Sequence, residues 1–351
     1  MKNQTEFSLE GVDIPATTLE NVKKILRLLQ SVTSLSVVAE FLKSKQLPHS
    51  AGSWTELEAT RILPAVQRRE IAVNELARLL AEAEEFGRFH VFLYTAKRKD
   101  AELLMERSRI EKTCRNLRLA GVFQEPLIEE IPAKPTLTEI RQDTLTGARC
   151  WVFKIVEERL EKRFVSETED ETTVRKEWEK VKVRAVNVAR LHESGFLEIR
   201  IQSHLSSTQY EADLNRVWLM LKDFLTPTQF SPLSLAKVKT QLWAQRKSLK
   251  QKIRFSDSKM QNNAGTTLIA STGREEADLF GDPGATASLD QFIDHGAHCD
   301  SSNVWWRPVE GLINREIHVL LSGMNNEFAV PASCTKVEYE FVLNELRANS
   351  K

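Results

Sequence analysis

A cationic stretch in the second half of the chain has the residue types best suited to bind a ligand. No acidic residue lies between Asp223 and Asp257, although the chain has 49 lysines and arginines against 49 aspartates and glutamates. The contact residues we expect there are Lys237, Lys239, Trp243, Arg246, Lys247, Lys250, Lys252 and Arg254. Lysine and arginine bind phosphates without regard to base sequence, and tryptophan can stack on an unpaired base. The stretch therefore predicts a surface that contacts a nucleic-acid backbone.

The expected helix over 235–251 would present these cations to solvent. Spacings of seven and four residues place Lys239, Arg246 and Lys250 close to one face, with Trp243 near it. Leucine and valine side chains can then face the core. A hairpin following the helix would extend the basic surface through Lys252 and Arg254.

An acidic segment follows the cationic one and leaves two further interpretations open. Its carboxylates are Glu275, Glu276, Asp278, Asp282, Asp290, Asp294 and Asp300. The cations could be a solvated helix face balanced by these carboxylates within one molecule. Alternatively, the two segments could join separate molecules, which would make the chain a protein–protein adaptor or sensor that assembles through complementary charged blocks.

Metal-dependent hydrolysis is the third hypothesis. His295, His298, Cys299 and Asp300 form the densest group of metal-capable side chains, but a structural zinc site usually needs a second separated pair of ligands. The motifs GxSxG, HExxH and GxGxxG are absent, so no catalytic residue and no cofactor is assigned. A non-enzymatic binding or scaffold protein, within a multi-protein system, is the favoured interpretation.

Composition indicates a cytoplasmic globular protein. Hydrophobic residues make up 41% of the chain and charged residues 28%. No apolar run approaches the roughly 18 residues of a membrane span, and the N-terminus lacks the apolar region of a signal peptide. Cys114, Cys150, Cys299 and Cys334 are far apart and form no CxxC pair, so we expect free thiols.

The expected fold class is α+β, with an all-helical domain over residues 1–121 and a hairpin-rich α+β domain over 148–351. A connector over 122–147, which contains Pro126, Pro132 and Pro135, would join them. One buried strand, His90–Tyr94, falls inside the helical part. Residues 192–195, 262–265 and 322–326 read as hairpin turns.

Several local patterns give more detailed expectations. Thr17–Glu20, Ser53–Glu56 and Thr335–Glu338 have the spacing of helix capping boxes. The acidic stretch 166–173 reads as a solvated loop, and Trp178 as a core or rim residue. A second cationic cluster is interleaved with glutamates, and Glu111 is placed to pair with Arg115 four residues later. Its cations are Lys97, Arg98, Lys99, Arg107, Arg109, Lys112, Arg115 and Arg118.

Overall fold

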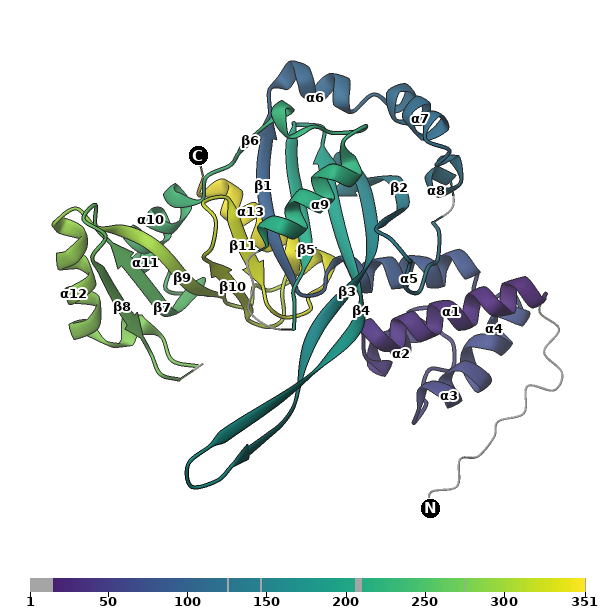
Figure 1. Ribbon diagram of the computed structural model, residues 1–351, viewed down its shortest axis with the longest axis horizontal. Coiled ribbons are helices and arrows are strands. Elements are labelled where there is room, and N and C mark those ends of the chain that lie inside the picture. Colours follow the sequence, from purple (N-terminus) through teal and green to yellow (C-terminus); the bar gives the residue numbers. More distant parts are fainter. Residues whose placement is uncertain (1–14, 125, 146, 206–209, 275, 351) are drawn as a thin grey trace. The chain divides into compact units, whose positions relative to one another are not determined.

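The computed structural model describes residues 15–350 except 125, 146, 206–209 and 275 (Figure 1). The chain forms two compact units. One unit consists of the chain up to Glu85 together with Pro126–Glu130, and the other of Phe86–Glu125 and Ile131 onward. None of the described helices has the length and apolar character needed to cross a membrane.

The first unit is helical. Its elements are α1 (Ala16–Val32), α2 (Leu35–Ser44), α3 (Trp54–Leu57), the π-helical η1 (Glu58–Ile62), α4 (Leu63–Gln67) and α5 (Val73–Glu85). The apolar stripe of α1 packs with α2 and α5 in one core. Ser53 caps α3 by accepting a 3.1 Å hydrogen bond from the backbone N–H of Glu56, as its pattern predicts. The capping box expected at Thr17 is absent, because α1 begins before it.

The second unit is built on one 11-stranded antiparallel sheet. The strand order is β2-β3-β4-β5-β1-β11-β10-β9-β7-β8, and β6 pairs with the outer part of β1. The strands are β1 (Phe89–Ala96), β2 (Thr136–Leu145), β3 (Ala148–Glu169), β4 (Val174–His192), β5 (Phe196–Gln202), β6 (Phe230–Pro232), β7 (Ile253–Gln261), β8 (Thr267–Ser271), β9 (His298–Trp306), β10 (Ile317–Leu321) and β11 (Glu327–Val330).

The expected fold class was wrong. The strand expected within a helical domain is β1, which lies in the middle of the large sheet. Phe89 on β1 pairs with Gln202 on one side and with Val330 on the other. The expected connector contributes β2 to the same sheet, since Pro132 and Pro135 precede that strand and do not interrupt it. A helical domain to residue 121 followed by a separate hairpin domain therefore does not describe this chain.

Helices cover the sheet and divide its apolar residues between two cores. Along β1, Phe89 and Val91 belong to one core and Phe92 and Tyr94 to the other, as the alternation of a strand requires. The first core includes side chains from α10 (Ala236–Ala244), α12 (Pro283–Asp294) and α13 (Lys336–Ala348). The second includes side chains from α6 (Arg98–Leu104), α7 (Arg107–Asn116) and α9 (Glu211–Leu221).

The three predicted hairpin turns are present, between β4 and β5, β7 and β8, and β10 and β11. In the first of these turns Gly195 has φ +83°, the left-handed region that favours glycine. Thr335 forms the predicted capping box with Glu338 at the start of α13.

Two strands extend far beyond the rest of the sheet. β3 and β4 stay paired from Cys150–His192 to Glu169–Val174, and Figure 1 shows their outer halves projecting as a hairpin. We call residues 160–182 the arm. Only the first half of the expected loop over 166–173 is strand, and residues 170–173 form the turn at the tip.

Candidate functional site

The cationic stretch does not form one continuous helix. The helix expected over 235–251 is broken at Gln245 into α10 and α11 (Arg246–Leu249). Because the helical path is interrupted, seven-residue spacing no longer places Lys239 and Arg246 on a shared outward face. The structure instead turns part of the cationic stretch toward the protein interior.

Four of the eight expected contact residues are buried: Lys239, Trp243, Arg246 and Arg254. The Lys239 ammonium donates a hydrogen bond to the backbone oxygen of Asp300. Arg246 donates to the Asp290 carboxylate, and Trp243 Nε1 donates to the same carboxylate at 3.1 Å. Trp243 is only 3% exposed, so it cannot be the stacking platform that its sequence position suggested.

Arg254 is held from several sides. Its Nε and Nη2 lie 2.9 and 2.7 Å from Glu316 Oε2, and its Nη1 donates to the backbone oxygen of Ala277 at 3.2 Å. Its guanidinium also stacks over the Trp305 ring at 4.3 Å. Of the expected nucleic-acid contacts, Lys237, Lys247, Lys250 and Lys252 remain exposed.

Carboxylates of the acidic segment pair with some of the cations in and near the cationic stretch. Asp290 pairs with Arg246, and Asp300 pairs with Lys259 at 2.9 Å. The two charged segments therefore balance each other within one molecule at these positions, as one of the interpretations of the sequence held. Head-to-tail assembly through these particular charges would first require breaking those pairs.

The expected metal ligands do not converge. On β9, His298 is exposed whereas Cys299 is buried, because neighbouring strand residues face opposite sides. His295 Nδ1 lies 2.7 Å from the backbone oxygen of Gln291, and Asp300 is paired with Lys259. Among the residues that the structure describes, no group of three or more His, Cys, Asp or Glu side chains could hold a metal ion.

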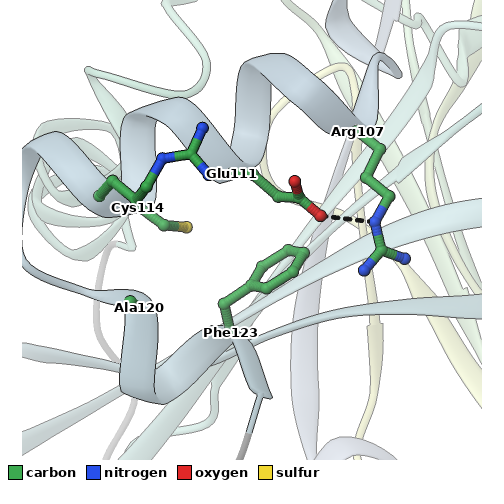
Figure 2. Close-up of a pocket in the computed structure, with 6 residues that line it drawn as sticks. Arg107, Glu111, Cys114, Ala120 and Phe123 are labelled. Atoms are coloured by element: carbon green, nitrogen blue, oxygen red, sulfur yellow. Dashed lines mark hydrogen bonds and ion pairs between the residues drawn. The ribbon is translucent and has the colours of Figure 1, made fainter.

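The second cationic cluster borders a cavity between α7 and α8 (Ala120–Gln124) (Figure 2). The cavity has a volume of about 530 Å³, and its lining residues are Arg107, Glu111, Cys114, Arg115, Ala120 and Phe123. Glu111 pairs with Arg107 at 2.6 Å and not with Arg115, as the dashed line in Figure 2 shows. Both partners of the Arg107–Glu111 ion pair therefore line the cavity. Arg109 points elsewhere and donates to the backbone oxygen of Phe224 at 2.8 Å.

A fully buried charged cluster lies between β5 and α13. Glu198 accepts a 2.5 Å hydrogen bond from the Tyr339 hydroxyl and a 2.9 Å bond from Arg200 Nη2. Burial opposes ionisation of Glu198, but Arg200 and His192 outweigh it and hold the pKa of this carboxyl well below its usual range. Glu198, Arg200 and Tyr339 are all buried, and the cluster joins β5 to α13.

A second polar network lies at the base of the arm. His204 places Nδ1 2.5 Å from Glu161 and Nε2 2.8 Å from Asp213. Both ring nitrogens of His204 are thus in contact with a carboxyl group. Burial opposes ionisation of Asp213, yet the hydrogen bond from His204 and the charge of Arg159 lower its pKa.

The remaining carboxylate of this network is also engaged. Glu157 accepts from Arg159 Nε at 2.8 Å and from Arg216 at 3.2 Å. Each acid in the network therefore already has a cationic or hydrogen-bonding partner. The arrangement fixes the position from which the arm departs, and it leaves no carboxylate free to act as a general base.

The arm itself is the most unusual surface of the second unit. From Lys162 to Lys180 every side chain is exposed except Ser166, which is half-buried. Large apolar side chains are exposed along it: Leu160, Phe164, Val165, Val174 and Trp178. Phe164 and Trp178 lie opposite each other across the two strands and make an edge-to-face contact, with ring centroids 5.4 Å apart.

Strand register places most of these apolar residues on one face. Phe164 pairs with Trp178, and a bulge at Val165 shifts the register before Ser166 pairs with Glu177. Beyond the bulge, Glu169 pairs with Val174. Counting two residues at a time, Leu160, Phe164, Trp178 and Val174 share one face. We call this the apolar face of the arm; the opposite face carries mainly charged residues such as Arg163 and Glu179.

Sequence reasoning missed this surface and placed Trp178 in the core or its rim, whereas Trp178 is 43% exposed and Phe164 53% exposed. The available signal was weak. From residue 158 to 184 apolar residues lie among charged ones, and nothing in this pattern shows that both faces of the ribbon are exposed to solvent.

Comparison of the chain with protein-family models and with curated protein sequences found no match.

Proposed function

We propose that this protein acts by binding another protein through the apolar face of the arm, and so serves as a scaffold or adaptor. The observation that carries the proposal is the exposed Phe164–Trp178 pair on a ribbon uncovered on both sides. Exposed apolar patches of this kind mark interaction sites, and aromatic residues are frequent among the residues that dominate binding energy.

Energetics support the same proposal. A two-stranded ribbon alone is only marginally stable in water. Burial of one large apolar side chain contributes about 1.5–3 kcal/mol. A partner that covered Leu160, Phe164 and Trp178 would therefore stabilise the complex and also order the arm.

Site-specific photocrosslinking tests the proposal. A photoreactive phenylalanine analogue replaces Trp178 on the arm, and a control variant carries it at Leu219, which is 64% exposed on α9. In the cells that produce the protein, irradiation should give a protein adduct from position 178 and little from position 219. The proposal is wrong if position 178 gives no adduct, or gives only one that nuclease removes.

The exposed lysines support a second candidate, binding to a nucleic-acid backbone. Lys237, Lys247, Lys250 and Lys252 make no ion pair with the residues that the structure describes. Each phosphate contact would steepen the salt dependence of binding. Fluorescence polarisation with a single-stranded oligonucleotide at rising salt provides the test. Changing all four lysines to glutamate should abolish binding without unfolding the protein, and unchanged affinity would rule this candidate out.

A further inference from the structure

The apolar face of the arm has its charges sorted along its length. On its inner part, nearest the sheet, the charged residues are Lys162, Lys180 and Lys182, all of them cations. On its outer part, together with the turn, the carboxylates are Glu167, Glu169, Asp170 and Glu171, with Lys176 as the only cation. The aromatic pair Phe164–Trp178 separates the two parts.

The inner cations lack sufficient compensation within the arm. Lys162 and Lys180 are directly opposite each other across the strands, an arrangement of like charges that destabilises a hairpin. Neither makes an ion pair with any residue in the described parts of the chain, whereas Lys182 pairs with Glu158 at 3.0 Å. At the outer end, Glu167 pairs with Lys176 at 3.1 Å, while Glu169 makes no ion pair with described residues.

We infer that the occupant of the apolar face is the arm of a second copy of this chain, packed face to face and antiparallel. This inference rests on the proposed function and names its partner. A two-fold axis at the Phe164–Trp178 pair makes the contact self-complementary and closed. It stacks the aromatic pairs of the two copies against each other and brings the cationic inner part of each arm to the acidic outer part of the other.

Strand spacing fixes which positions meet. Lys162 and Lys180 lie two residues inside the aromatic pair, and Glu167 and its ion-pair partner Lys176 lie at the matching step outside it. Leu160 and Lys182 lie four residues inside, and Val174 and Glu169 lie at the matching outer step. Antiparallel packing superposes these steps. Two cations then face a glutamate–lysine ion pair at the first step, and an apolar residue and a cation face an apolar residue and a carboxylate at the second. Parallel packing would instead place cations against cations.

Charge reversal tests this arrangement in two matched variants. The first carries Lys162→Glu and Lys180→Glu, and the second carries Glu167→Lys and Glu169→Lys. All four side chains are exposed, so both variants should fold, which circular dichroism and thermal melting verify. Light scattering of the wild type should give about twice the chain mass of 40.1 kDa. Each variant alone should be a monomer, and an equimolar mixture should recover the dimer, because opposite charges then meet at the reversed step.

The outcomes separate this inference from the proposed function. A wild-type dimer that both variants leave intact would overturn antiparallel arm packing. A wild-type monomer together with a photocrosslinked adduct between position 178 and a different protein would also overturn the second copy as occupant, while the proposed function would stand. A wild-type monomer without any adduct at position 178 would contradict both the proposed function and the second copy as occupant.

Discussion

Tyr339 donates a hydrogen bond of 2.5 Å to Glu198, 141 residues earlier in the chain. Tyr339 belongs to α13 and Glu198 to β5, and both side chains are almost completely buried. Arg200 occupies the other carboxylate oxygen at 2.9 Å and lies over the Tyr339 ring at 3.8 Å. These three side chains join the C-terminal helix to the middle of the sheet through charge as well as apolar contact.

Removing the charge from this cluster should be costly. Glu198→Gln leaves Arg200 buried without its counter-charge, which should lower the free energy of unfolding by about 3–5 kcal/mol. Tyr339→Phe removes only a hydrogen bond and should cost about 1–3 kcal/mol. Urea unfolding followed by circular dichroism measures both. If Glu198→Gln costs no more than Tyr339→Phe, the ion pair does not have the importance assigned to it.

The same cluster should make stability depend on acid pH. The pKa of Glu198 in the folded protein lies below its ordinary value of 4.5. The stability that this group contributes is therefore complete above that value and is lost as the pH falls, because the unfolded chain takes up a proton that the folded chain does not.

Each pH unit in the acid range should remove about 1.4 kcal/mol for this one group. In urea unfolding from about pH 5 to about pH 3, the free energy of unfolding should fall less steeply with pH in Glu198→Gln than in the wild type. The difference between the two slopes should correspond to one proton. Parallel declines in the two proteins would contradict the assignment of this proton to Glu198.

Local patterns predicted local structure well. Ser53 and Thr335 cap the helices that follow them, and Gly195 adopts the positive φ that its hairpin needs. Each of these features depends on residues within four positions of one another.

Strand order could not be predicted in this way. Phe89 pairs with residues 202 and 330, and no pattern near Phe89 specifies either partner. The strand was visible in the sequence, but its central place in the sheet depends on pairings separated by more than a hundred residues.

For the charged residues, the segments were visible in the sequence but the partner of each charge was not. The sequence showed a cationic segment and an acidic one, and their attraction was foreseeable. Whether Arg246 meets Asp290 of its own chain or an external anion depends on the helix break at Gln245 and on where α12 packs. The arm was missed because Phe164 and Trp178 alternate with charged residues on a ribbon that has no buried face.

The cationic segment should divide into structural and dispensable residues. Arg254→Ala removes a buried guanidinium that makes hydrogen bonds to the part-exposed Glu316, and should lower the unfolding free energy by about 1–3 kcal/mol. Lys250→Ala, a matched change at an exposed position, should stay within about 0.5 kcal/mol of the wild type. Chemical unfolding of the two variants side by side is the measurement. Equal effects would mean that Arg254 is not held as the structure describes.

The β4–β5 turn should tolerate no side chain at Gly195. Its φ is +83°, and an added Cβ would lie 3.0 Å from both the Ala96 backbone oxygen and the Ala101 Cβ. Gly265 has nearly the same φ, +82°, but open space around it. Gly265→Ala should cost about 1 kcal/mol for the backbone conformation alone, and Gly195→Ala should cost clearly more. Thermal melting of both variants measures the difference, and equal losses would argue against the close approach at Gly195.

The four cysteines should be unreactive in the native protein. Burial raises the pKa of Cys150 to about 11, and burial likewise raises that of Cys334 to about 12. Only the thiolate reacts with Ellman's reagent, and near pH 8 a thiol of pKa about 11 is ~0.1% ionised. Cys114 and Cys299 are also buried, and their pKa values are raised mainly by desolvation.

The thiols of the native protein near pH 8 should therefore react with Ellman's reagent slowly, at the rate of local opening. In denaturant without reductant, all four thiols should react at once. Single Cys→Ser variants assign any fast phase to its residue. A fast phase from Cys150 would contradict its buried position. Fewer than four thiols in denaturant would show that some of the cysteines are oxidised, against the separate thiols that the structure places at these positions.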